Sequence, residues 1–325
     1  MSNVISKAVY STASAAAAKQ KGAVLMLLAA AFFWGSGNIA NKSVLQDLDP
    51  FAAAALRNLI AALALVPFAF REFRRVAAPS AWLLSALPSS VLFAGAIILQ
   101  QWGYQSATVT NASFLVNAAT VVTPILAFFI LKHQLQPCII LAAILTLLGA
   151  FLMSGATTSL QAMNKGDLAC LGSALFYGAW MVALGQHAAR FNSPAATTCL
   201  HCITAAVFAA IIVATIAPHQ PGTIAGAMAE LLYLGVFSSA LAFGLTAAAQ
   251  AHLSASTAAV LVAAESLFGA AGAIVVLGEQ PSITVCAGAT LIGMAILIAA
   301  RSPARAAERP PEFYSRRLNR KENLQ

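Results

Sequence analysis

The sequence predicts an all-α integral membrane protein with ten transmembrane helices, arranged as two inverted five-helix repeats. Three observations lead to this prediction. Hydrophobic residues make up 60% of the 325-residue chain and charged residues only 9%, whereas soluble domains carry about 25% charged residues. Apolar runs of about twenty residues, each long enough to cross the bilayer core as a helix, occupy most of the chain. These runs fall into two blocks of five, and the two blocks have similar sequence patterns.

The continuity of the runs favours helices over strands. A transmembrane barrel alternates apolar and polar residues in segments of about ten, whereas these runs are unbroken and rich in Leu and Ala. We expect spans at 22–44, 50–70, 82–104, 107–131, 136–156, 166–187, 194–217, 228–249, 254–278 and 281–300. The first repeat then covers 22–156 and the second 166–300, which leaves no soluble domain able to hold a separate catalytic core.

Two polar segments flank the repeats. Residues 1–21 are small, polar and mildly basic, and they lack the apolar core of a signal peptide. We expect a mobile cytoplasmic tail there. Residues 301–325 are polar and basic and include several prolines, which predicts a second cytoplasmic tail.

Basic residues predict the orientation, because Lys and Arg accumulate in cytoplasmic loops. With the N-terminus inside, most Lys and Arg fall on the inside, and only Lys42 and Lys165 fall in outer loops. We therefore expect a multi-pass protein of the cell inner membrane with both termini cytoplasmic. The net charge of +8 follows from insertion and requires no nucleic-acid partner, and the basic tail can contact anionic membrane lipid.

An internal repeat supports the inverted arrangement. The matching pairs are Phe33-Trp34-Gly35 with Phe176-Tyr177-Gly178, Asp49-Pro50 with Ser193-Pro194, and Arg57 with His201. Each half has an odd number of spans, so the second half must insert upside down relative to the first. Inverted repeats are typical of secondary transporters, whose substrate binds near the membrane midplane between the halves.

Several segments also resemble a known family. They are FFWGSGNIANKSVL, DPFAAAALRNLIAALALVP, QQWGYQSATVTNASFLVNAATVVTPILAFFIL, GDLACLGSALFYGAWMVAL, LYLGVFSSALAFGLTAAAQAHLSAS and VVLGEQPS. Together they are similar to EamA-type transporters of the drug/metabolite transporter superfamily, over residues 22–300. The resemblance implies two inverted five-helix repeats that move small metabolites, often by proton exchange. It also implies that helices one to four and six to nine surround the cavity, with five and ten at the periphery.

The chain departs from the family pattern at two places. The ninth helix has Glu265-Ser266 where the family often has Glu-Pro, and the fourth ends with His133 where an acidic residue is common. The first change is expected to remove a kink, and the second makes the halves less symmetric. Both differences weaken an inference of this chain's substrate from the substrates of the family.

Ionisable side chains inside a bilayer are costly, and they persist mainly where they face a cavity or a partner. Glu265 is the candidate for proton coupling, because an apolar cavity disfavours its charged form and allows it to load and release a proton. The alternative is a structural carboxylate tied to Arg57 or to backbone. Arg57 can clamp a substrate carboxylate or phosphate, or it can extend toward the interface or cap a helix. His201 is a further binding candidate, with a satisfied interhelical histidine as its alternative.

Uncharged polar and aromatic residues complete the candidate binding set. They are Trp34, Asn38, Asn41, Gln100, Gln101, Asn111, Asn117, Tyr177 and Trp180. Such side chains bind polar metabolites, and they also join helices to one another. We expect no cofactor and no metal: Cys199, His201 and Cys202 lack a second ligand pair at a zinc-type spacing.

The sequence thus predicts a secondary transporter that moves a small metabolite (an amino acid or related compound, or a drug) by alternating access. Proton-coupled export is the expected mode. An uncoupled facilitative transporter or channel is the alternative. An integral-membrane enzyme would need a cluster of ionisable or metal-binding residues at one membrane face, and the sequence shows none. The substrate, the direction of transport and the oligomeric state stay open.

Overall fold

The computed structural model describes residues 2–107, 109–132, 136–154, 163–215, 224–277 and 280–302. Within these residues the regular elements are all helical, and ten helical segments are long and apolar enough to cross a membrane. The predicted all-α fold with ten spans is confirmed.

The first five spans begin and end close to the expected residues. They comprise α1 (Ser2–Asp47), α2 (Pro50–Phe73), α3 (Pro79–Ser106), α4 (Val109–Asn117), α5 (Ala119–Leu131) and α6 (Pro137–Ser154). Proline begins α2, where Asp49 caps the helix by accepting from the backbone N–H groups of Phe51 and Ala52. Proline suits the first helical position because its missing N–H would have no partner there.

The second five spans use the same local signals. They comprise α7 (Lys165–Arg190), α8 (Pro194–Thr215), α9 (Met228–Tyr233), the π-helical segment η2 (Leu234–Leu241), α10 (Ala242–Gln250), α11 (Ala255–Val262), α12 (Ala264–Leu277) and α13 (Ile283–Arg301). Asn164 and Asp167 form a capping box at the start of α7, and serines cap α11 and α13.

Helix α1 differs from the expected N-terminal tail. It is continuous from Ser2, and its membrane-spanning part starts at Ala17. The Ala-rich stretch before the span explains the extension, because Ala is the strongest helix former. Gln20 Nε2 donates to Ser302 O at 2.6 Å. The near ends of the first and last spans therefore lie at the same end of the bundle.

The fourth and ninth spans are each interrupted. The breaks fall at Ala118 and Ala263, where backbone N–H groups bond three residues back, from Ala118 to Leu115 O and from Ala263 to Val260 O. In the ninth span α11 ends at Val262 and α12 begins at Ala264, and the intervening Ala263 keeps right-handed helical dihedral angles. The expected loss of a kink at Ser266 stays a prediction. His133 lies outside the described residues.

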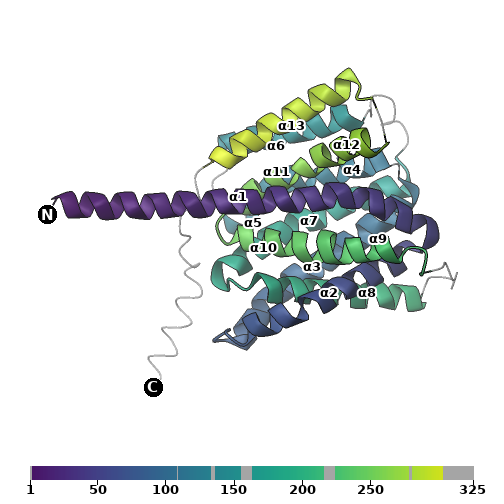
Figure 1. The fold of residues 1–325 in the computed structure, drawn as a ribbon, viewed down its shortest axis with the longest axis horizontal. Coiled ribbons are helices and arrows are strands. Elements are labelled where there is room, and N and C mark those ends of the chain that lie inside the picture. Colours follow the sequence, from purple (N-terminus) through teal and green to yellow (C-terminus); the bar gives the residue numbers. More distant parts are fainter. Residues whose placement is uncertain are drawn as a thin grey trace.

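Antiparallel pairing organises the bundle (Figure 1). Helix α3 packs along α7, α2 along α8, and α6 along α13, while α1 crosses the middle of the view. The α6–α13 pair lies at one edge and packs closely, since a Cβ on Gly149 would lie 2.6 Å from Gly288 O. Large apolar side chains cover the outside, and Phe129 is 72% exposed, as a lipid-facing surface requires.

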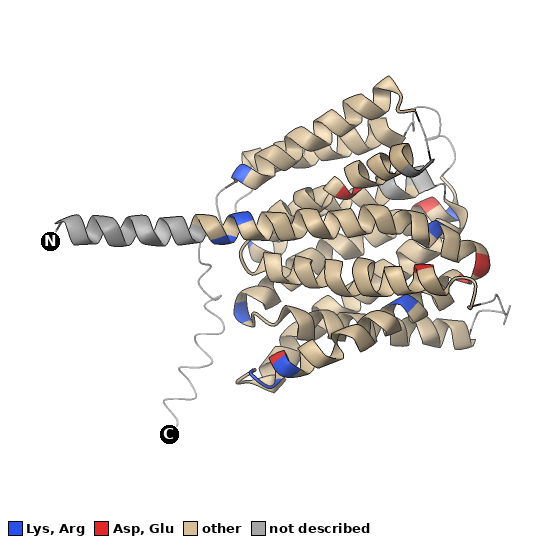
Figure 2. Ribbon diagram, in the orientation of Figure 1, with Lys and Arg blue, Asp and Glu red and all other residues tan. Residues whose placement is uncertain are grey.

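Charged side chains gather at the two ends of the bundle, and few lie between them (Figure 2). The apolar middle matches the bilayer core, where an ionised side chain is costly. The few charged groups in that middle, Arg57 and Glu265 among them, line the site described next.

Candidate substrate cavity

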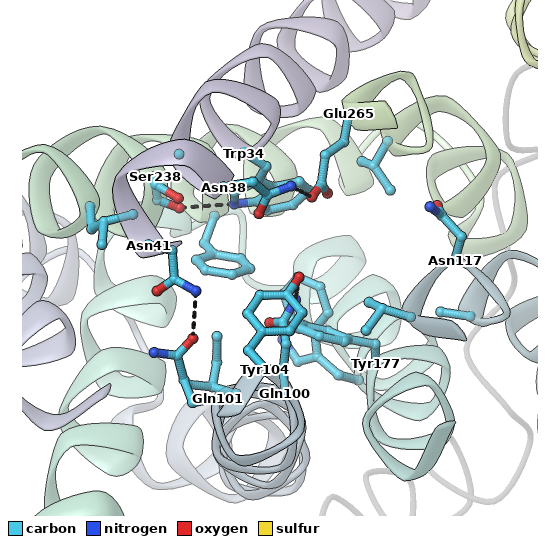
Figure 3. A pocket seen from close by; sticks show the side chains of 18 of the residues that line it. Trp34, Asn38, Asn41, Gln100, Gln101, Tyr104, Asn117, Tyr177, Ser238 and Glu265 are labelled. Carbon is cyan, nitrogen blue, oxygen red and sulfur yellow. Dashed lines mark hydrogen bonds between the residues drawn. The ribbon is translucent and has the colours of Figure 1, made fainter. Parts of the chain in front are cut away.

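A cavity of about 100 Å³ lies among α1, α2, α3, α7, η2 and the two broken spans. Most of the predicted site residues line it together (Figure 3). They are Trp34, Asn38, Asn41, Arg57, Gln100, Gln101, Asn117, Tyr177, Trp180 and Glu265. His201 does not line it, and the side chain of Asn111 lies outside the described residues.

Glu265 enters the cavity from the first turn of α12, directly after the break at Ala263. Its Oε1 accepts a hydrogen bond from Asn38 Nδ2 on α1 at 2.8 Å. The Asn38 donor favours the carboxylate, whereas loss of water disfavours it. The side chain makes no ion pair within 4.0 Å in the described part of the chain, so its charge is available to a ligand.

Arg57 supplies the cationic side of the cavity from α2. Its side chain is 7% exposed, and its Nε and Nη2 donate to Ser239 Oγ at 3.1 Å and Ser238 Oγ at 3.3 Å. Both serines belong to the π-helical segment η2, a rare geometry that recurs at functional sites. No carboxylate among the described residues forms an ion pair with Arg57, so the hydroxyls position a cation without neutralising it.

Two buried amides leave hydrogen-bonding capacity unused. Asn41 Nδ2 donates to Gln101 Oε1 at 3.1 Å. Asn41 Oδ1 and Gln101 Nε2 have no partner within the described residues, although both side chains are almost completely buried. Buried polar atoms are nearly always satisfied. An acceptor and a donor that line a cavity without partners are therefore suited to a polar ligand.

Aromatic side chains form much of the remaining wall. Tyr177 Oη donates to Gln100 Oε1 at 2.8 Å, and Gln100 Nε2 donates to Tyr104 Oη at 3.1 Å. Trp34 Nε1 donates to the carbonyl oxygen of Ser238 at 2.8 Å. These bonds fix the polar ends of the rings, so the cavity has rigid apolar surfaces beside its charged groups (Figure 3).

The comparisons with known proteins place the fold in a family. The model of the EamA-like transporter family matches residues 21–155 and again 164–301. The chain belongs to the EamA-like transporter family. The two matched segments coincide with the two repeats expected from the sequence, and the resemblance to EamA-type transporters is confirmed.

The relatives agree with a membrane transporter. A protein of Archaeoglobus fulgidus named an uncharacterized transporter is 26% identical over 270 residues, which cover 82% of this chain and 81% of that protein. One crystal structure of a protein has a TM-score of 0.70 at 17% identity and covers 86% of this chain and 96% of its own. That structure supports the fold alone. The family and the named relative point to a transporter rather than an enzyme.

In this EamA-family chain, His201 lies behind the cavity wall and is fully buried. Its Nδ1 accepts the indole N–H of Trp180 at 3.4 Å, so the proton must be on Nε2, which lies 3.0 Å from Ser89 Oγ. Ser89 in turn donates to Ala86 O. His201 is therefore a neutral, satisfied histidine that holds Trp180 in the wall. Its sequence neighbour Cys199 contacts Ala62 O through Sγ.

The sequence alone did not identify the two serines that hold Arg57. Ser238 and Ser239 carry no signal of their own in an apolar span, and their convergence on Arg57 depends on the π-helical turn of η2. A possible signal was their position in the segment LYLGVFSSALAFG, which belongs to the family resemblance.

Proposed function

We propose that this EamA-family chain is a proton-coupled secondary transporter that exports a small zwitterionic metabolite, an amino acid or a close relative. One observation carries the proposal. Arg57 and Glu265 line the same buried cavity from different helices, and neither has an ion-pair partner among the described residues. Buried charges are normally paired, and a ligand with one carboxylate and one ammonium group would pair both.

The chemistry of the two groups assigns the ends of the ligand. The planar guanidinium of Arg57 suits a carboxylate, to which it can donate two parallel hydrogen bonds. Glu265 and the Asn38 beside it suit an ammonium group. The unused oxygen of Asn41 and the unused NH₂ of Gln101 add hydrogen bonds along the ligand, and the aromatic walls accommodate an apolar side chain.

The size of the cavity favours a metabolite over a drug. Its volume is about 100 Å³, whereas sites for drug-sized ligands measure about 300–1,000 Å³. A cavity of this size favours a compact solute. We therefore place amino acids ahead of amphipathic drugs as substrates.

Competition at Glu265 provides the coupling. The carboxylate can hold either the substrate ammonium or a proton, and it cannot hold both. A proton arriving from outside neutralises Glu265 and releases the substrate outward. Loss of that proton to the cytoplasm restores the carboxylate for the next substrate. One proton enters for each zwitterion that leaves.

The helix pairings support alternating access by inverted repeats. Equivalent helices of the two halves make equivalent contacts. Helix α3 packs on α7, and its counterpart, the eighth span (α9, η2 and α10), packs on α1. Likewise α5 packs on α7, and its counterpart α12 packs on α1. Each half also contains one span that is interrupted by a single residue beside the cavity, Ala118 in the first half and Ala263 in the second. Basic residues gather at the end of the bundle where Gln20 contacts Ser302, and we assign that end to the cytoplasm because Lys and Arg accumulate in cytoplasmic segments.

Purified protein in liposomes tests the proposal. A panel of amino acids is assayed for exchange with and without an imposed pH gradient. We expect a pH gradient to drive accumulation of at least one amino acid in the wild type. Glu265→Gln should abolish that response, whereas Glu230→Gln, at the end of the bundle where Ser43 contacts it, should retain it. Amino-acid flux that ignores the pH gradient in the wild type would favour the uncoupled carrier instead.

A further inference from the structure

A second and larger cavity adjoins the first. It measures about 510 Å³ and lies among α1, α4, α6, α12 and α13. Asn38, Asn117 and Glu265 line both cavities. We call the second cavity the vestibule. Its polar rim includes Lys42, Gln280 and Ser282, and its walls are mostly apolar, with residues such as Ile39, Phe114, Met153 and Ala273.

Two hydrogen bonds between helices lie at the boundary of the cavities. Asn38 Nδ2 donates to Glu265 Oε1 at 2.8 Å and joins α1 to α12. Asn117 Nδ2 donates to Ser266 Oγ at 3.0 Å and joins α4 to α12. Both residue pairs connect the first repeat to the second. A relative movement of the halves therefore breaks these bonds and opens one cavity to the other.

The helices are interrupted next to these bonds. Asn117 is the last residue of α4, directly before the break at Ala118, and Ser266 lies in the first turn of α12 after the break at Ala263. Discontinuous helices can pivot at such points without unwinding the segments on either side. The two breaks thus allow α4 and α12 to separate while α5 and α11 keep their packing.

Close packing of α1 against α12 closes the inner end of the vestibule, beside Glu265. A Cβ on Gly35 would lie 2.6 Å from Glu265 O and 2.8 Å from Gly269 N, so α1 and α12 are in backbone contact there. Toward the rim the contact loosens, and a Cβ on Gly272 would lie 3.5 Å from Ile39 Cδ1. The vestibule therefore opens at the end of the bundle that carries Lys42.

We propose that the vestibule is the outer passage for the zwitterionic solute, closed from the central cavity by the Asn38–Glu265 and Asn117–Ser266 hydrogen bonds. The inference rests on the proposed function. Its chemistry suits the same solute class: Lys42 at the rim attracts a carboxylate, Glu265 at the base attracts an ammonium group, and apolar walls accept the side chain. The same passage brings the external proton to Glu265.

Thiol accessibility tests the passage. Cys138 and Cys286, which are not buried, are first replaced by Ser. Ala273→Cys then places a thiol in the vestibule wall. Val275→Cys, two residues further along α12 and 81% exposed outside the vestibule, places the matched control toward lipid. Right-side-out vesicles are treated with a membrane-impermeant trimethylammonium methanethiosulfonate, and the rates of thiol modification are compared.

We expect the thiol at 273 to react at least tenfold faster than the thiol at 275, and its modification to abolish amino-acid exchange. Equal, slow rates would overturn the proposal and indicate that lipid fills the vestibule. Fast modification that leaves exchange intact would overturn the passage as well. A protein that transports no amino acid before modification refutes the proposed function, while the labelling rates still report whether the vestibule contains water.

Discussion

Arg57 and His201 occupy equivalent positions in the two halves, seven residues after the prolines that begin α2 and α8. Their surroundings differ. Arg57 lines the cavity with two serine hydroxyls as partners and no counter-ion in the described part of the chain. His201 is sealed behind the wall with both ring nitrogens occupied. The repeat supplies matched backbone positions, and the proposed substrate contact lies at the position where hydrogen-bonding capacity is left over.

Replacing Arg57 should produce the largest effect. Arg57→Gln removes the charge that pairs with the substrate carboxylate and leaves the carboxylate desolvated, which costs about 2–5 kcal/mol. We expect kcat/KM for exchange to fall at least about 30-fold. Arg57→Lys should restore only part of the activity, because an ammonium group lacks the bidentate fork. Liposome exchange kinetics measure this, and an unchanged KM in Arg57→Gln would exclude the clamp.

His201 should respond differently to substitution. His201→Leu removes the acceptor for the Trp180 N–H, and we expect lower thermal stability and a several-fold higher KM. His201→Asn retains an acceptor and should be closer to the wild type. The difference in fluorescence between each protein and the same protein with Trp180→Phe isolates the signal of this ring, because the chain has four tryptophans. If His201→Leu behaved like Arg57→Gln, with binding lost and stability kept, then His201 would be a substrate ligand and the contrast between the two positions would disappear.

The pH dependence of exchange should also separate His201 from the residues that line the cavity. Because His201 is held neutral by the Trp180 N–H, His201→Asn should leave the pH profile of exchange in its wild-type shape. Glu265→Gln should flatten it. Exchange measured from acid to alkaline pH in symmetric buffers separates the two variants. A profile that shifts on His201→Asn would place proton transfer at the histidine.

The smallest expected effect is at Asn41. Asn41→Leu removes the unused acceptor and leaves Gln101 Oε1 without its donor. A hydrogen bond to a neutral group contributes about 1 kcal/mol, so we expect a rise in KM of about fivefold. Thr146→Val provides a control, because that hydroxyl is buried away from the cavity and bonds only its own helix. Equal KM values in the two variants would remove Asn41 from the site.

Much of this molecule is predictable from the sequence. Run length and composition predict the ten spans, and prolines such as Pro50 and Pro194 mark helix starts. The rarity of charged residues in apolar runs identifies Arg57 and Glu265. The breaks at Ala118 and Ala263 are not predictable from local sequence, because alanine favours an unbroken helix. The seal around His201 depends on Ser89 and Trp180, which come from other helices, so only tertiary structure reveals it.

The central claim is that Arg57 and Glu265 hold the two ends of one zwitterion. The most direct test measures binding of three related ligands to wild type, Arg57→Gln and Glu265→Gln by calorimetry. The ligands are L-valine, its amide, which lacks the carboxylate, and 3-methylbutanoate, which lacks the ammonium group. The account predicts that Arg57→Gln weakens binding of valine and 3-methylbutanoate and spares the amide, whereas Glu265→Gln spares 3-methylbutanoate. Equal losses for all three ligands in both variants would contradict it.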